Sequence, residues 1–480
     1  MTRRHARVAL AALIVSLWAC GSDRGVPTDI AGGYSGGGVG GLTHNACYLD
    51  PNPNIPNDGA AVLTLDASVK YQTMEGFGAS MRLFDDPRVT NTLDPATKRA
   101  SAIATPLDQR LILDALWLDA GFTRVRFFAG DGGIEPVNDN ADPLVADAAK
   151  FDFAGDRGDG QLDLVPGLML RGARTYFVAT PALESWMTES NPAEYAEWLL
   201  VMLRHWRERG YELPYVSLKN EPGSAASGGV WSAAFLRDVT KLLGARIKAE
   251  GMKTKIVLPD DVTPSEAYAR LQVILADADA RQYVGAVAYH AGAPGGELEI
   301  KQLAEQYGIP VWVTGFSTPD WMETATKLQT LIADDGASAV DYTWGFYGDQ
   351  ETSQLIRLVQ TNGAYERFSI KKHYYAMGQY SRFVPPGAVR IKATSNDPNL
   401  VGTAYVLGAK LIVVAIYLGF PYEHAVRVEL GTGAPCVKRF NAVRTSDAES
   451  WNILPQGFTT IPRISVTMPA RSVLTFVAQE

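Results

Sequence analysis

The stretch "NPAEYAEWLLVMLRHWRERGYELPYVSLKNEPG", residues 191–223, decides the fold. Large apolar side chains recur in it at the i, i+3, i+4, i+7 spacing of an amphipathic helix, which we expect over Ala193–Arg209. Pro192 suits the first turn of that helix, and Gly210 suits its end. The apolar run Tyr215–Lys219 then predicts a buried strand. A helix followed at once by such a strand indicates a fold built from repeating β/α units.

The same alternation of apolar runs and amphipathic stretches continues in both directions from this unit. Eight units of this kind predict a (β/α)₈ barrel, a fold of the α/β class, over residues 71–385. The expected barrel strands are Thr73–Ala79, Thr123–Phe128, Thr175–Thr180, Tyr215–Lys219, Lys255–Leu258, Val284–Tyr289, Pro310–Thr314 and Ala339–Trp344.

The pattern changes after Pro385-Pro386-Gly387, and short strands without helices predict a β-sandwich over residues 386–480. An apolar run at residues 61–70 precedes the barrel, and we expect it to pair into this sandwich, which both chain ends would then build. The expected C-terminal strands are Val389–Ala393, Leu400–Val406, Leu411–Tyr417, Ala425–Leu430, Val437–Ala442 and Ser472–Ala478.

The N-terminus has the pattern of an export signal over residues 1–20. Three arginines precede the apolar run Val8–Leu17, which is too short to span a bilayer permanently. The following Leu17–Gly21 resembles a bacterial lipobox, so we expect Cys20 to carry a lipid; a plain secretory signal is the alternative. Residues 21–60, rich in Gly, Pro and Asn, predict a tether. We therefore expect an exported protein, on the outer surface or in the periplasm.

Composition narrows the partners of the chain. A formal net charge of −8 argues against a nucleic-acid or anionic-membrane binder, so a membrane is expected only through the lipid anchor. The six histidines show no metal-ligand spacing, and no cofactor is expected. Cys47 and Cys436 remain after Cys20 and form a plausible disulfide in an exported protein, with free thiols as the alternative. We expect a monomer.

Chemistry in a barrel is placed at the C-terminal ends of its strands. The fourth expected strand ends in Asn220-Glu221-Pro222. Cleavage of a glycosidic bond needs a proton donor at the leaving oxygen, and a Glu in a partly desolvated cleft has the raised pKa for that role. Asn220 beside it would bind a sugar hydroxyl. Glu221 is therefore the first candidate for a catalytic group.

Several motifs together resemble glycoside hydrolase family 30, whose members are retaining β-glycosidases with a (β/α)₈ barrel and a β-sandwich. The resemblance covers about residues 62–480 and rests on the motifs as a set, since none of them is specific alone. The motifs are Gln72–Gly78, Thr123–Arg126, Leu218–Pro222, Tyr374–Val384 with Pro386-Gly387, and Pro469–Val473.

The resemblance implies a role for each matching position. Glu221 would be the general acid/base, and Asn220 would bind the sugar of the cleaved subsite. Arg126 would support the floor of the site, with a structural ion pair as the alternative. His290 matches the family's histidine after the sixth strand, and Trp344 matches its sugar platform after the eighth, with a core tryptophan as the alternative.

The chain departs from the family at the position of the nucleophile. A carboxylate should follow Thr314, but Gly315 stands there. The family's His-x-Tyr is His290-Ala291-Gly292, and its Ser-Pro-Trp is Thr180-Pro181-Ala182. An engineered substitution explains one lost carboxylate; three losses together favour natural divergence.

Other acids near strand ends are candidates for a displaced base. Gly315 removes a side chain, and we expect a water-sized gap in its place, which suits an inverting mechanism with a water between two carboxyls. For each candidate, a solvated loop acid is the alternative. The candidates are Glu184, Glu135, Asp131, Asp260, Asp261 and Asp320.

The sequence thus predicts a β-glycoside hydrolase that acts on an extracellular polysaccharide or glycoconjugate, with Glu221 as its acid/base. Two other hypotheses stay open. One is a carbohydrate-binding lipoprotein that has lost turnover, and the other is a structural lipoprotein without a ligand.

Overall fold

The computed structural model describes residues 59–478, apart from 131–132, 157, 181–183, 228, 436, 438, 456–457 and 460–462. The expected export signal with Cys20, the tether, the cysteine pair Cys47 and Cys436, Asp131 and the Pro181-Ala182 departure therefore lie outside the described residues. No helix within the described part has both the length and the apolar character that a membrane crossing requires.

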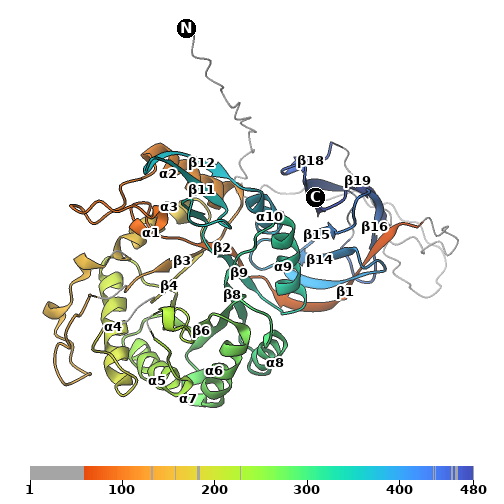
Figure 1. Ribbon diagram of the computed structural model, residues 1–480. Helices are drawn as coiled ribbons and strands as arrows, with labels where there is room; N and C mark the ends of the chain where they lie inside the picture. The colour runs from red at the N-terminus through yellow and green to blue at the C-terminus, as the bar shows by residue number, and fades with distance from the viewer. Residues whose placement is uncertain are drawn as a thin grey trace, which may run out of the picture. The chain divides into compact units, whose positions relative to one another are not determined.

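Eight parallel strands close into a barrel in the order β2-β3-β4-β5-β6-β7-β8-β9, which confirms the predicted fold (Figure 1). Each predicted run overlaps one strand, although β8 extends two residues beyond Thr314 and includes Gly315. The strands are β2 Gly76–Ser80, β3 Arg124–Phe128, β4 Thr175–Ala179, β5 Tyr215–Ser217, β6 Lys255–Asp261, β7 Val284–His290, β8 Val311–Phe316 and β9 Ala339–Tyr342.

The helices of the barrel begin where the sequence supplies caps. The side chains of Ser232, Thr263 and Asp320 each accept a backbone N–H in the first turn of α5, α6 and α9. The predicted helix after Asn191 is α4, which begins at Pro192. The helices are α1 Pro87–Thr90, α2 Pro106–Leu113, α3 Val165–Leu170, α4 Pro192–Glu208, α5 Ala233–Ala249, α6 Pro264–Ala276, α7 Ala278–Arg281, α8 Glu297–Tyr307, α9 Trp321–Ala333 and α10 Lys372–Ser381.

A second sheet combines strands from both ends of the described chain. Strand β1, Ala61–Thr73, pairs antiparallel with β13 and parallel with β16, which confirms that the run before the barrel joins the sandwich (Figure 1). Strands β18, β19 and β20 of this sheet were not predicted from the sequence. The other strands are β13 Val389–Ser395, β14 Leu400–Leu407, β15 Lys410–Tyr417, β16 His424–Leu430, β17 Arg439–Ser446, β18 Asn452–Ile453, β19 Phe458–Thr459, β20 Arg463–Met468 and β21 Ser472–Ala478.

A small three-stranded sheet follows the last barrel strand. It consists of β10 Phe346–Tyr347, β11 Ile356–Thr361 and β12 Ala364–Ile370, in that order. Strand β10 begins four residues after β9 ends, so this sheet continues from the C-terminal end of the barrel.

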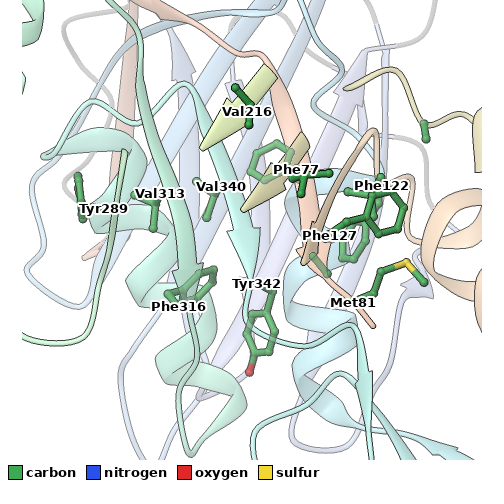
Figure 2. Close-up of a cluster of buried hydrophobic side chains, with 14 of the residues drawn as sticks. Phe77, Met81, Phe122, Phe127, Val216, Tyr289, Val313, Phe316, Val340 and Tyr342 are labelled. Carbon is green, nitrogen blue, oxygen red and sulfur yellow. The ribbon is translucent and has the colours of Figure 1, made fainter. Parts of the chain in front are cut away.

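Apolar side chains fill the space between the barrel strands and the surrounding elements. Figure 2 shows part of this core, with Phe77, Phe122 and Phe127 gathered beside Met81. A separate cluster consists of strand residues alone and fills the barrel interior: Phe177, Val257, Ala286, Ala288, Trp312 and Ala339. The sandwich encloses its own core, to which β1 contributes Leu63 and Leu65.

A buried ion pair explains the glycine at the end of the Gly76-Phe77-Gly78 motif. The guanidinium of Arg124 lies 3.0 Å from the carboxylate of Asp341, and both side chains are fully buried. Arg124 also lies over the ring of Trp312, 3.9 Å from its centroid. A Cβ at Gly78 would lie 2.6 Å from the Asp341 carboxylate and even closer to the carbonyl oxygen of Arg124. Only glycine lets the first barrel strand pass this pair.

We predict that Gly78→Ala destabilises the protein by at least about 1–3 kcal/mol, because the added methyl group overpacks a site that the backbone itself bounds. Urea denaturation of the parent and the variant measures the change. Gly167→Ala in α3 is the control, since its new Cβ makes only an ordinary contact with Arg171. Equal stability of Gly78→Ala and the parent would contradict this packing.

Candidate active site

Glu221 lies at the C-terminal end of the barrel, four residues beyond the end of β5. Its φ of 53° is left-handed, a conformation that costs energy for a residue with a side chain. The backbone N–H of Glu221 donates to the carbonyl oxygen of Asp260 at 2.9 Å, and that of Asn220 donates to Thr180 at 2.8 Å. Two neighbouring strands therefore hold this turn in place.

Two side chains bind the carboxylate of Glu221. His290 Nδ1 lies 3.0 Å from Oε1, and the hydroxyl of Ser227 donates to Oε2 at 2.5 Å. The buried ammonium of Lys219 donates to the carbonyl oxygens of Asn220 and Ser227, and so fixes the loop that carries Glu221 and Ser227. Ser227 and Lys219 were not predicted as site residues. Lys219 lies within the motif Leu218–Pro222 but was given no role there, and Ser227 lies outside the motifs, because the role of both depends on how this loop closes.

Asp260, at the end of β6, joins the site from below. Its carboxylate accepts hydrogen bonds from Ser217 at 2.8 Å and from Thr314 at 2.5 Å. Arg126 donates to it at 2.7 Å. His290 Nε2 lies 3.3 Å from Asp260 Oδ1, an ion-pair distance rather than a well-directed hydrogen bond. His290 therefore stands between two carboxylates, those of Asp260 and Glu221.

Arg126 connects this group to Asn220. One guanidinium nitrogen of Arg126 donates both to Asp260 and, at 2.6 Å, to the side-chain oxygen of Asn220. Both sequence hypotheses for Arg126 thus describe part of its position, since it is an ion-pair partner of a barrel carboxylate and also contacts Asn220. The structure therefore brings Glu221, Asn220, Arg126 and His290 together.

Exposure separates the members of this group. The side chain of Glu221 is 28% exposed, whereas those of His290, Arg126 and Asp260 are 13%, 2% and 0% exposed. Glu221 is therefore the charged group through which this network meets solvent.

The charge state of Glu221 differs from the sequence expectation of a raised pKa. The hydrogen bond from His290 lowers the pKa of Glu221 to about 2, against the effect of burial, and Ser227 and Arg126 act in the same direction. Glu221 is therefore a carboxylate at neutral pH in the free protein. The prediction failed because the sequence shows an apolar strand before Glu221, but not the histidine that faces it.

The groups around Glu221 also have shifted pKa values. Burial alone would lower the pKa of His290, but the carboxylates of Asp260 and Glu221 raise it above its ordinary value. Burial alone would raise the pKa of Asp260, but Arg126, His290 and Thr314 hold it well below its usual range. Burial lowers the pKa of Lys219 to about 8. The two carboxylates that flank His290 therefore favour its protonated form.

At Gly315, where the sequence predicted a water-sized gap, the ring of His290 lies next to the glycine. A Cβ at this position would lie 3.1 Å from the Cγ and Cδ2 atoms of His290 and 3.2 Å from the hydroxyl of Thr343. The His290 ring thus packs against Gly315, where a nucleophile's side chain would begin. Gly315 is paired with His290 across β7 and β8, and its carbonyl oxygen accepts from Ala291 at 2.8 Å.

Trp344 belongs to an aromatic group beside this network. Its φ is 69°, and its ring lies 4.7 Å from that of Tyr347 and 5.5 Å from that of Phe128. Phe128 in turn lies under Arg126, whose guanidinium is 4.6 Å from the ring centroid. Arg82 lies over Phe128 as well, at 4.5 Å. Trp344 is thus one ring away from the buried arginine of the site.

The other candidate acids Asp260, Asp261 and Asp320 form ion pairs and hydrogen bonds with other parts of the barrel and sandwich. Asp261 pairs with Arg270 at 2.7 Å and accepts from the backbone of Gly223 at 2.9 Å. Asp320 caps α9 and binds Arg471 at 2.9 Å. As shown above, Asp260 already binds four side chains. Each of these three carboxylates therefore has a structural role.

Of the remaining candidates in the described part of the chain, Glu135 lies in the loop after β3 and Glu184 lies in the loop after β4, and a hydrogen bond connects the two loops. Glu184 accepts hydrogen bonds from the backbone of Gly133 at 2.8 Å and of Glu135 at 2.9 Å. Burial raises the pKa of Glu135 to about 7. Across the described part of the chain, no cluster of three or more His, Cys, Asp or Glu side chains is placed to hold a metal ion.

We compared the chain with protein families and with curated proteins. No family model matches the chain. The chain is 21% identical over 376 residues to the Neurospora crassa endo-1,6-β-D-glucanase, covering 70% of this chain and 75% of that protein. It is 24% identical over 391 residues to putative glucosylceramidase 2 of Caenorhabditis elegans, covering 70% and 72%. An alignment with an Aspergillus fumigatus endo-1,6-β-D-glucanase has 21% identity over 222 residues and spans 42% of this chain and 44% of that protein.

Solved structures share the whole architecture. The family 30 subfamily 8 xylanase of Clostridium acetobutylicum has a TM-score of 0.67 at 22% identity, covering 87% of this chain and 99% of that one. The catalytic domain of family 30 xylanase C from Talaromyces cellulolyticus has a TM-score of 0.70 at 20% identity, covering 87% and 100%. These likenesses show a common fold.

In its barrel, its associated β-sandwich and its curated relatives, the chain is similar to glycoside hydrolases. Within that class, it is a distant relative of the family 30 enzymes, which confirms the resemblance that its motifs predict.

We predict that Asp260→Asn destabilises the protein by about 3–5 kcal/mol, because it leaves the buried guanidinium of Arg126 without its counter-charge. Urea denaturation at pH 7 measures the loss. Asp279→Asn, at an exposed position in α7, should leave stability within about 0.5 kcal/mol of the parent. If both variants were as stable as the parent, Asp260 would not anchor the site.

Proposed function

We propose that the chain is a β-glycoside hydrolase that acts on an extracellular polysaccharide or glycoconjugate, with Glu221 meeting the glycosidic oxygen. The main support for this proposal is that Glu221 is the most exposed charged side chain in the group that it forms with His290, Arg126 and Asp260 at the C-terminal end of the barrel. Its position between His290 and Ser227 gives it both a proton source and a fixed orientation.

Asn220 and Trp344 support this proposal as binding groups. Arg126 occupies the side-chain oxygen of Asn220, which leaves the amide N–H groups to donate to a sugar hydroxyl. The aromatic group of Trp344, Tyr347 and Phe128 offers ring faces for sugar stacking.

The proposed reaction differs from the retaining route of family 30. Retention needs a second carboxylate about 5–5.5 Å from the first, to form the glycosyl-enzyme intermediate. Gly315 supplies none, so we expect weak or no retaining hydrolysis. An inverting route needs a free base about 6.5–9.5 Å away. The structural roles of Asp260, Asp261 and Asp320 argue against each of them as that base.

A second candidate function is glycan binding without turnover. The observation that favours it is the packing of the His290 ring against Gly315, at the place where the side chain of a nucleophile would begin. Binding and cleavage distinguish the two candidates. A glycan array tests the first, and turnover of aryl β-glycosides tests the second.

The relatives suggest which sugars to test first. Two of them are named endo-1,6-β-D-glucanases, one a putative glucosylceramidase, and the solved neighbours include xylanases. We therefore propose β-1,6-glucan as the first substrate, followed by glucosylceramide and xylan.

We predict that Glu221→Gln lowers any β-glycosidase activity by at least about 10²–10⁴-fold while glycan binding persists, because the amide keeps the shape but transfers no proton. Initial rates on aryl β-glycosides, together with the glycan array, measure the two effects. Glu299→Gln, at an exposed position in α8, is the matched control. A Glu221→Gln protein as active as its parent would move the catalytic group elsewhere.

We also propose that the protein is exported and lipid-anchored, on the basis of the sequence pattern around Cys20. Cys20→Ser should then abolish incorporation of labelled lipid and release the protein in soluble form. Membrane fractionation of cells expressing either version measures this. Unchanged membrane association of the variant would count against the anchor.

A further inference from the structure

His290 contacts two carboxylates, one beside each of its ring nitrogens. Its Nδ1 is hydrogen-bonded to the Glu221 carboxylate at 3.0 Å, and its Nε2 lies at an ion-pair distance of 3.3 Å from the Asp260 carboxylate without a directed hydrogen bond, so a carboxylate charge lies beside each ring nitrogen. A neutral imidazole has only one N–H to donate, whereas an imidazolium has two. Two carboxylates on opposite sides of one ring therefore select the protonated form.

Gly315 provides the room for this arrangement. Its missing side chain would begin 3.1 Å from the His290 ring, closer than most real Cβ contacts, and the Thr343 hydroxyl bounds the same space at 3.2 Å. A side chain at position 315 must therefore move the ring, and with it the contacts to Glu221 and Asp260. The loss of the expected nucleophile and the position of His290 are coupled.

We propose that His290 stores the proton that the site delivers to the glycosidic oxygen, and that Gly315 permits this by leaving space for the ring between Asp260 and Glu221. This inference rests on the proposed function of the site. His290 acts through Glu221, so it is a positioning and proton-supplying residue, while Glu221 touches the substrate.

The proton step balances without a further reactant. The Nδ1–H bond of His290 breaks as its proton passes to Glu221, and Glu221 gives a proton to the leaving oxygen as the C1–O bond breaks. The oxygen of a water molecule bonds to C1, and that water releases a proton to solvent. His290 regains a proton from solvent, so the net reaction converts glycoside and water to a hemiacetal, the free sugar, and the alcohol of the leaving group.

The charged groups around His290 come from three other barrel strands or strand ends. Glu221 after β5 and Asp260 in β6 favour its protonated form, and Arg126 in β3 opposes it. Lys219, a further cation of the same loop as Glu221, is held by backbone oxygens. The two direct contacts are both with carboxylates, so protonation of His290 is favoured.

This proposal predicts a different pH dependence from that of Glu221 acting alone. If His290 supplies the proton, activity falls as the pH rises through the pKa of His290, which lies above its ordinary value of 6.5. In His290→Gln, Glu221 loses the main cause of its low pKa, so that pKa returns toward 4.5. The alkaline limb of the pH–rate profile should therefore move down by about 2 pH units or more.

The first experiment needs no activity. Nitrogen-15 NMR of labelled full-length protein follows the two ring nitrogens of His290, assigned by their absence in His290→Gln, from pH 5 to 9. We expect both to carry protons at pH 7, and Glu221→Gln to lower the midpoint of this titration. A neutral His290 at pH 7 would overturn the inference, whether or not the protein hydrolyses glycosides.

The second experiment tests the space at Gly315. In Gly315→Ala, we expect the His290 midpoint to fall by at least 1 pH unit, because the ring is pushed from its carboxylates. Gly160→Ala is the control, since its Cβ would be similarly close, at 3.3 Å, to the flexible end of Leu83, away from the site. If folded Gly315→Ala keeps the parent's midpoint, the coupling to Gly315 is wrong.

The third experiment links the stored proton to turnover. Imidazole added to His290→Ala should raise the aryl β-glycosidase activity of this variant at least 10-fold. It should not change the activity of the control His205→Ala, because His205 belongs to α4 and lies outside the site. No rescue with measurable residual activity overturns the proton-supplying role. A parent without any activity, but with a protonated His290, would refute the hydrolase and leave the charge state of His290 supported.

Discussion

One buried carboxylate organises the C-terminal end of the barrel. Asp260 receives Arg126 from β3, Ser217 from β5, Thr314 from β8 and the edge of His290 from β7. Five of the eight barrel strands thus meet at one charge, counting the strand of Asp260 itself. Removing a buried charge from water is expensive unless each of its oxygens is bound. Asp260 meets that condition, and in doing so fixes the positions of the groups that hold Glu221.

Backbone strain is concentrated around the same charge. Glu221, Asp260 and Trp344 all have positive φ, and they are three of only eight such non-glycine residues in the described part of the chain. Each such conformation costs of order 1–3 kcal/mol, and it persists only where the surroundings determine it. The ion pairs and hydrogen bonds of Asp260 supply that determination. The site is therefore held in shape before any ligand arrives, as electrostatic preorganisation requires.

The barrel and the position of Glu221 were predictable because both follow from local pattern. Apolar periodicity locates strands and helices, and the rule that chemistry lies at strand ends selects Glu221. The charge state of the site was not predictable in this way. It depends on His290, which is distant from Glu221 in sequence and reaches it only through barrel closure. Likewise, Asp260 was a candidate base in the sequence and became an anchor in the structure, because Arg126 and Thr314 reach it from other strands. Strand β20 was missed although Ile464, Val466 and Met468 alternate with polar residues, which is the pattern of a half-buried strand.

The pairing of β1 with β13 and β16 has a consequence for the order in which the molecule forms. Leu63 lies opposite Ser395, and more than 300 residues separate them, so this contact closes a very long loop in an unfolded chain. The barrel removes most of that separation. Its own first and last segments meet where the backbone of Met74 exchanges hydrogen bonds with Gly387 and Ala388. Once the barrel has closed, the two ends of the chain emerge side by side, and β1 finds its partners across a short distance. The barrel thus serves as the template on which the sandwich is completed, and a chain interrupted before Val389 would carry β1 without either of its partner strands.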